Sequence, residues 1–363
     1  MPLLVLPAMI GVLVDHAGMS DSSAGWSASA HFLASFVVGL VLSLRVHRLN
    51  LRRVATFALV VASMADVASA LTAGETPAFF AARIVAGVML GSVYIACVSA
   101  FARQEDYERG FGLFVTLQFV VSGLGLYLVP VYAESLGAFG LFAGLAVLDV
   151  LALLLARFLP DDRAAAADSL HGDPASELRI LLATSALLAI LGFTVFEAAN
   201  NAQFTYIERF GVALDISDSR IGIALLVASL VGIPGAFSIV VVGHRFGTLG
   251  PIVAGILVAV AGLGVLLGAT TYTAYFFGSA CMGFSWAFCL PFIQSFLAGI
   301  DRKGSAVAAG TSFSTFGSSI GPGIAAVVVM GGNYANVFRL SLGLFGLTLV
   351  AFILADRTRR DAP

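Results

Sequence analysis

The chain has 363 residues, of which 59% are hydrophobic and 11% charged, and its formal net charge is −2. Soluble domains carry about 25% charged residues, so this composition excludes an ordinary soluble globular protein. The near-neutral charge also argues against a nucleic-acid partner. A lipid bilayer can instead act as the solvent for such an apolar exterior.

Long apolar runs between charged or turn-forming residues predict an all-α membrane protein with twelve transmembrane helices, because a helix needs about 20 residues to cross the hydrocarbon core. In chain order the runs are Pro2–Val14, Ser23–Leu44, Val54–Leu71, Pro77–Phe101, Gly110–Tyr132, Gly137–Leu159, Leu178–Tyr206, Ile221–Val242, Pro251–Gly268, Thr273–Ala298, Ser305–Met330 and Tyr334–Leu354.

The first run is too short for a full crossing, since its roughly fourteen residues reach only about 20 Å of the roughly 30 Å required. We therefore expect a first helix that is shortened at its start. A signal peptide is the alternative, and it is disfavoured because no basic region precedes the apolar run.

Fifteen of the 19 Lys and Arg residues fall in or beside alternate gaps between the runs, and two more, Arg83 and Arg339, lie inside runs. Short loops rich in Lys and Arg stay cytoplasmic, so this alternation predicts that both termini are cytoplasmic. The residues on the predicted cytoplasmic side are Arg45, Arg48, Arg52, Arg53, Arg103, Arg109, Arg157, Arg163, Arg179, Arg245, Arg302, Lys303, Arg357, Arg359 and Arg360. The opposite gaps hold only Arg209 and Arg220.

A long hydrophilic stretch at 160–177 divides the runs evenly and reads as a central cytoplasmic loop. It predicts an N-terminal six-helix bundle at 1–159 and a C-terminal six-helix bundle with a short basic tail at 178–363. A weak repeat supports this division, because His47-Arg48-Leu49-Asn50 follows the second run and His244-Arg245-Phe246-Gly247 follows the eighth.

Twelve spans in two sets of six around a central loop resemble the major facilitator superfamily of secondary transporters over the whole chain. The turn Gly-x-Leu-Ala-Asp-Arg-x-Gly-Arg-Arg that is common in that family corresponds to residues 43–52. Arg48 and Arg52 agree with it, whereas Ser43, His47 and Asn50 replace the first Gly, the Asp and the second Gly. The resemblance implies that the turns containing His47, Arg48 and Arg52, and His244 and Arg245, help to gate the cytoplasmic side.

Two further patterns are similar to those of the family. They are Arg83 followed by Gly87 and Gly91 in the fourth span, and the helix-bending segment 317–323 in the eleventh. The fifth span contains Gly123, Gly125 and Pro130 but departs from the Gly-Pro-x-x-Gly-Gly signature that is associated with antiporters of the family. The resemblance further implies that spans 1, 2, 4, 5, 7, 8, 10 and 11 line a central cavity.

The seventh span is the most polar, with Glu197, Asn200 and Asn201 at i, i+3 and i+4 on one helical face and Gln203 extending the stripe. An ionisable group in lipid costs about 2.5–3.5 kcal/mol, so this stripe needs a wet cavity or polar partners. We predict contact with substrate or protons, and an interhelical hydrogen-bonded seam is the alternative.

Other polar residues within the spans have two interpretations each. Arg83 forms an ion pair within the bundle or attracts an anionic substrate, and its guanidinium stays charged, so it is no proton carrier. His31 carries a proton or is a hydrogen-bonded core residue. The family resemblance places Gln118, Trp286 and Gln294 in the cavity. Structural pairing or snorkelling is expected of the ionisable residues in the supporting spans, which are Asp66, Asp149 and Arg339.

These features predict a secondary active transporter that moves a small organic solute by alternating access, coupled to protons, with Glu197 as the candidate carrier and His31 in reserve. No nucleotide-binding or hydrolase motif occurs, so we expect no enzyme, cofactor or metal. Few Lys and abundant Ala, Gly and Arg suit a GC-rich bacterial genome, so we expect a protein that crosses the inner (plasma) membrane many times. We also expect it to be a monomer. The alternatives are a facilitative uniporter, a drug-efflux antiporter, and a non-transporting membrane sensor.

Overall fold

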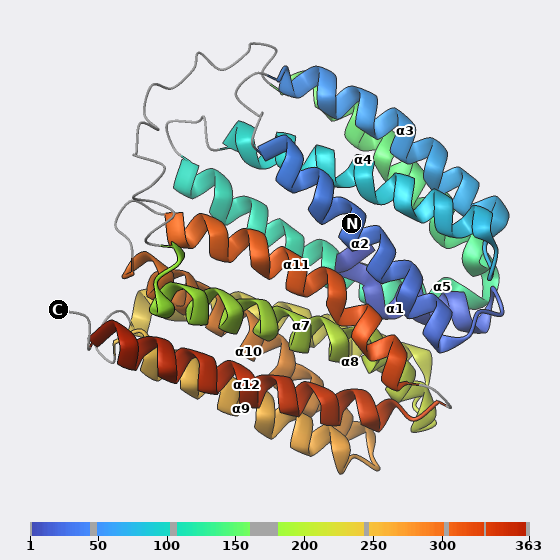
Figure 1. The fold of residues 1–363 in the computed structure, drawn as a ribbon. Helices are drawn as coiled ribbons and strands as arrows, with labels where there is room; N and C mark the ends of the chain where they lie inside the picture. The colour runs from blue at the N-terminus through green and yellow to red at the C-terminus, as the bar shows by residue number, and fades with distance from the viewer. Residues whose placement is uncertain are drawn as a thin grey trace.

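The computed structural model describes residues 2–43, 49–101, 107–159, 181–242, 247–300, 305–329 and 332–360. These ranges form eleven α-helices and two short 3-10 helices (Figure 1). The elements are η1 (Pro2–Val5), α1 (Leu6–Asp15), α2 (Asp21–Ser43), α3 (Leu51–Thr72), α4 (Pro77–Phe101), α5 (Tyr107–Leu155), η3 (Ala156–Phe158), α7 (Thr184–Ala213), α8 (Asp218–Val242), α9 (Leu249–Leu267), α10 (Tyr272–Ala298), α11 (Ser305–Val328) and α12 (Tyr334–Arg360). The predicted loop at 160–177 lies outside the described residues, as do His47, Arg48, His244 and Arg245 of the predicted gating turns.

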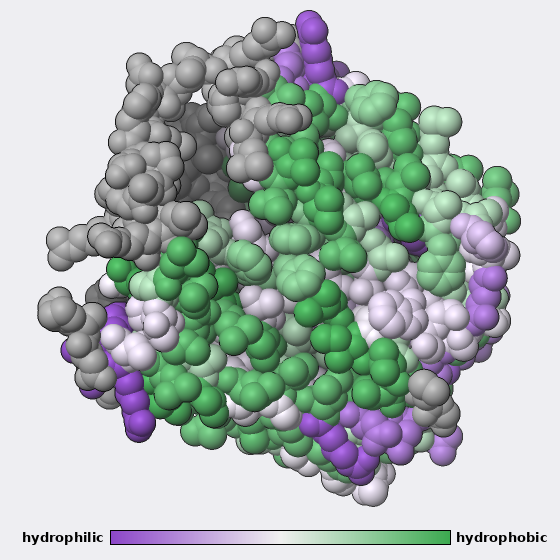
Figure 2. All heavy atoms as spheres, viewed as in Figure 1, coloured by the Kyte–Doolittle hydropathy of each residue, from purple (hydrophilic) through white to green (hydrophobic). Residues whose placement is uncertain are grey.

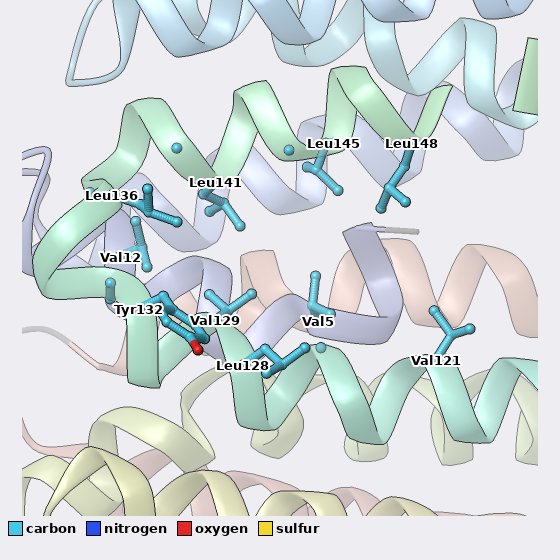
Figure 3. Close-up of a pocket in the computed structure, with 15 residues that line it drawn as sticks. Val5, Val12, Val121, Leu128, Val129, Tyr132, Leu136, Leu141, Leu145 and Leu148 are labelled. Atoms are coloured by element: carbon cyan, nitrogen blue, oxygen red, sulfur yellow. The ribbon is translucent and has the colours of Figure 1, made fainter. Parts of the chain in front are cut away.

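The helix count differs from the predicted twelve because the fifth and sixth runs form one element, α5. Its backbone is helical except at Gly137, where φ is 55° and ψ is −161°. Positive φ costs glycine little because it has no Cβ, so the chain reverses there without a loop. Figure 3 shows the two arms of α5 turning back on each other between Tyr132 and Leu136. Both predicted helices are therefore present as the two arms of α5, and they count as one element because only Gly137 between them leaves the helical conformation.

Nine of the described helices are long and apolar enough to cross a membrane, judged by length and composition. α1 has ten residues and is the short first helix that the sequence predicts. α11 is long but, with many Ser, Thr and Gly residues, is not among the nine. Large apolar side chains such as Phe57, Met64 and Val240 are exposed, and Figure 2 shows an apolar surface between polar residues that gather towards the helix ends.

α7 lies at the centre of the packing, and 67% of its apolar stretch is buried. It packs against α11, α12 and α1. Within the first part of the chain, α4 packs against α2 and α3, and α3 packs against α5. The first and second parts meet where α2 contacts α11, α5 contacts α8 and α1 contacts α7 (Figure 1).

Candidate functional site

The polar face of α7 is built around Glu197, whose side chain is 5% exposed. Its Oε1 accepts a hydrogen bond from Nε1 of Trp286 on α10 at 3.1 Å. Its Oε2 accepts from Oγ of Ser318 on α11 at 3.0 Å and from Nδ2 of Asn201 at 3.2 Å. One carboxyl group therefore connects three helices. It accepts all three hydrogen bonds, so all three can form while Glu197 is ionised.

Glycine residues on α11 allow Ser318 to reach this carboxyl group. A Cβ at Gly317 would collide with the Thr194 carbonyl oxygen, and one at Gly321 would lie 2.8 Å from the carbonyl oxygen of Ala198. Small residues let helices approach closely in lipid. The segment that the sequence indicates as helix-bending thus serves as the contact surface between α11 and α7.

The remaining members of the predicted stripe are buried but make different contacts. Asn200 donates from Nδ2 to the carbonyl oxygen of Phe196 at 2.9 Å, one helical turn back. Its Oδ1 and the Oε1 of Gln203 are buried, and neither has a donor among the described residues. Buried amide oxygens without donors are costly, so these two groups are suited to binding a water molecule or a solute group.

Trp286 also connects this face to the first part of the chain. Its ring lies 6.0 Å from that of Phe119 on α5 in an edge-to-face arrangement, and Gln118 beside Phe119 is half-buried. A second aromatic contact across the two parts joins Phe36 and Phe316, whose ring centroids are 5.4 Å apart. Gln294 is half-buried, two turns beyond Trp286 on α10.

Arg83 lies in a separate buried cluster. It forms an ion pair with Asp66 of α3, and both side chains are 1% exposed. Its Nε donates to Oγ of Ser69 at 2.9 Å, and its guanidinium lies 4.7 Å from the ring of Phe142 on α5. Of the two interpretations of Arg83, the geometry fits the ion pair, because the guanidinium has partners on α3 and α5 and does not reach a surface.

His31 adjoins this cluster through the backbone. Its Nδ1 lies 3.0 Å from the carbonyl oxygen of Arg83, and its side chain is 3% exposed. Asp149 of α5 lies close enough to Asp66 and Arg83 for both charges to act on its carboxyl group. Asp66 thus has a structural ion-pair partner in Arg83, whereas Arg339 bonds to Asn336 on its own helix at 2.8 Å.

A third polar group joins the two parts at the end of the bundle where α1 and α7 terminate. Arg209 of α7 contacts Asp15 of α1 at 2.6 Å and Asp21 of α2 at 3.6 Å. The backbone oxygen of Asp21 accepts from Tyr206 at 2.7 Å, and its carboxyl group accepts from Tyr334 at 3.0 Å. The sequence did not single out this group, although Arg209 is conspicuous as a cation in a gap otherwise poor in Lys and Arg.

Two further features lie away from these groups. An apolar crevice of about 260 Å³ runs between α1 and the two arms of α5, lined by residues such as Val5, Leu128 and Leu145 (Figure 3).

Arg52, which belongs to a predicted gating turn, donates from Nε to the carbonyl oxygen of Leu159 at 2.9 Å. No group of three His, Cys, Asp or Glu side chains that could hold a metal occurs within the described ranges.

An all-helical protein with apolar outer faces and a buried polar centre is a polytopic membrane protein, and comparison with known proteins gives its family. The model of the Major Facilitator Superfamily matches residues 3–300. The chain therefore belongs to this superfamily, as the sequence patterns suggested, and it is a membrane transporter and not an enzyme.

Solved structures with the same fold have low sequence identity to this chain. A point mutant of the nucleoside transporter NupG is 12% identical, with a TM-score of 0.79, over 98% of this chain and 96% of that one. NupG itself is 15% identical, with a TM-score of 0.75, over 98% and 94%. The human organic anion transporter MFSD10 (TETRAN) is 18% identical, with a TM-score of 0.66, over 96% and 95%. Comparison with curated protein sequences gives no match.

Proposed function

We propose that this protein is a secondary active transporter that carries a small organic solute across the plasma membrane, with Glu197 at its coupling site. The observation that carries the proposal is the buried Glu197 carboxyl group, which holds donors from α7, α10 and α11 in the interior of a transporter fold. Intramembrane ionisable groups of this kind are costly and are associated with substrate and proton pathways.

Transport would proceed by alternating access between two six-helix bundles, residues 1–159 and 178–363, if α1, α11 and each arm of α5 count as crossings. The bundles meet at α2–α11, α5–α8 and α1–α7, which are the surfaces that would slide or open during rocking. The charge pattern supports cytoplasmic termini. In that orientation the group around Arg209 lies on the outer side and holds that side closed.

Proton coupling is supported by the surroundings of Ser318. Its Oγ lies 3.0 Å from Oε2 of Glu197 and 3.2 Å from the carbonyl oxygen of Ser314. While Glu197 is ionised, the hydroxyl donates to it. Once Glu197 binds a proton, the hydroxyl can turn to donate to Ser314 and accept from the carboxyl group. The same geometry thus accommodates both protonation states.

Small organic solutes with polar and aromatic groups are the proposed substrates. The buried oxygens of Asn200 and Gln203 and the rings of Trp286 and Phe119 provide polar anchors and an aromatic wall, which suit such a ligand. Nucleosides and organic anions should be tested first, because the neighbouring structures are transporters named for them.

The test is uptake by proteoliposomes containing Glu197→Gln, measured against pH with and without an imposed proton gradient. We expect the variant to lose gradient-driven accumulation, while exchange of solute down its own gradient persists. Glu134→Gln is the matched control, because Glu134 is exposed. Unchanged transport and unchanged pH dependence in Glu197→Gln would show that this carboxyl group has no coupling role.

Facilitative uniport is the second candidate, and the same three hydrogen bonds favour it if they hold Glu197 permanently as a structural carboxylate. Uptake that a protonophore does not affect, together with a Glu197→Gln variant that is merely less stable, would select uniport.

A further inference from the structure

A second buried carboxyl group, Glu208, lies in the contact between the two parts of the chain. It precedes Arg209 on α7 and is 5% exposed. Its carboxyl group packs against Gly11 of α1, where a Cβ would lie 2.5 Å from Oε2 and 2.8 Å from Oε1. The side chain therefore fills the space that the missing side chain of Gly11 leaves, and only separation of α1 from α7 would expose it.

The surroundings of Glu208 are unfavourable for a negative charge. Its Oε2 is buried and has no donor among the described residues. The neighbouring cation, Arg209, is already engaged by Asp15 and Asp21. An ionised Glu208 would add a third carboxylate to one guanidinium at a buried position, which is costly.

Each element around Glu208 contributes a titratable or charged group. They are Asp15 and the following His16 at the end of α1, Asp21 on α2, Arg209 on α7, Asp218 on α8, Tyr275 on α10 and Tyr334 on α12. The oxygen of Tyr275 donates to the carbonyl oxygen of Ile207 at 3.1 Å. Its proton is therefore used by the backbone rather than by Glu208.

We infer that Glu208 is a proton-binding site that is filled when α1 closes on α7 and emptied when they part. On closure the carboxylate takes one proton from water and enters the contact with Gly11 as a neutral acid. On opening it meets water again and releases that proton on the side where the gap forms. This inference rests on the proposed alternating access and adds a coupling site separate from Glu197.

Linkage sets the expected size of the effect. If closure binds one proton, the ratio of closed to open molecules rises by at most about tenfold for each unit of falling pH. A neutral side chain at position 208 removes this dependence and favours the closed form at every pH.

The test measures the distance between the two parts of the chain at the end of the bundle that holds Arg209. Spin labels are attached at Ala78→Cys and Thr270→Cys, after the three native cysteines are replaced by Ala, and the distance is measured by double electron–electron resonance. Both positions are exposed. Ala78 begins α4, close to the Glu75–Ser20 contact, and Thr270 precedes α10. We expect the short distance to gain population as pH falls in otherwise unchanged protein, and to predominate at all pH values in Glu208→Gln. Glu208→Leu, which is uncharged and of similar size, is the second variant.

Controls separate the possible failures. Glu134→Gln and His16→Gln should keep the pH dependence, and His16 is included because imidazole titrates near neutral pH. Arg209→Gln should populate the long distance, because it removes the ion pairs. If that variant opens but Glu208→Gln and Glu208→Leu keep the full pH response, Glu208 is not the proton site, although alternating access stands. If no variant opens at any pH, both proposals are wrong.

Discussion

The buried cluster around Arg83 allows a prediction with a defined magnitude. Asp149 of α5 lies close to the buried Arg83–Asp66 ion pair, and a second carboxylate beside one buried guanidinium would be costly. The Oδ2 atoms of both residues are buried and have no hydrogen-bond partner among the described residues, so the site compensates poorly for two negative charges. We predict that the two carboxyl groups together carry one negative charge, which pairs with Arg83, and one proton.

Asp149→Asn should therefore cost less than about 1 kcal/mol of unfolding free energy, since it replaces a neutral acid by a neutral amide of similar shape. Asp66→Asn should also lower the unfolding free energy only moderately, because Asp149 can then ionise and pair with Arg83. The double variant leaves Arg83, 1% exposed, with no carboxylate, and removing the partner of a buried ion costs about 3–5 kcal/mol. The two substitutions should thus be strongly non-additive.

The assay is reversible unfolding in detergent micelles, with the four proteins of the double-mutant cycle compared at one neutral pH. Asp215→Asn is the control, because Asp215 lies in a turn at φ 56°, a conformation that Asn tolerates well. Additive losses, or a cost for Asp149→Asn equal to that of the double variant, would refute the shared proton.

Three further outcomes are expected. Ser318→Ala should shift the pH profile of transport, whereas the control Ser319→Ala should not. The Ser319 hydroxyl donates to the carbonyl oxygen of Thr315 at 2.7 Å instead of to Glu197. Equal profiles for the two variants would contradict the proposed reorientation of the Ser318 hydroxyl. Gly321→Val should lower stability by about 1–3 kcal/mol through overcrowding against the α7 backbone, and an unchanged melting temperature would argue against this close contact. Hydrogen bonds from Ser20 lower the pKa of Glu75, so these bonds stabilise the folded protein fully at neutral pH and lose their effect as pH falls through that lowered pKa. The melting temperatures of the original protein and of Glu75→Gln should therefore converge in acid. A constant difference between them would exclude the linkage.

The sequence was most informative where the argument was local to one helix. The spacing of Glu197 and Asn201 predicted a shared face, and the structure joins the two side chains at 3.2 Å. Hydrophobic runs likewise placed most of the helices, because apolar length determines a membrane crossing. The break between the fifth and sixth runs was placed next to Gly137, where the chain reverses. That a single glycine would make the turn without a loop was not predicted, since nothing in the sequence distinguishes one left-handed glycine from the other glycines of an apolar run.

Partners from distant segments could not be predicted. Ser318 contacts Glu197 only because Gly317 and Gly321 bring α11 against α7, and the sequence showed these glycines simply as a bend. Asp66 meets Arg83 because α3 packs against α4. Such contacts depend on how helices are arranged, which a single sequence with little charge does not specify.

Both proposed proton sites belong to one uninterrupted rod. Glu197 and Glu208 are separated by about three turns, so they project from the same side of α7 roughly 16 Å apart along its axis, and α7 contains no proline. A tilt of α7 that separates Glu208 from α1 must therefore also displace Glu197 from its hydrogen-bond partners by a comparable distance. The stiffness of α7 would therefore couple the protonation of Glu197 to that of Glu208.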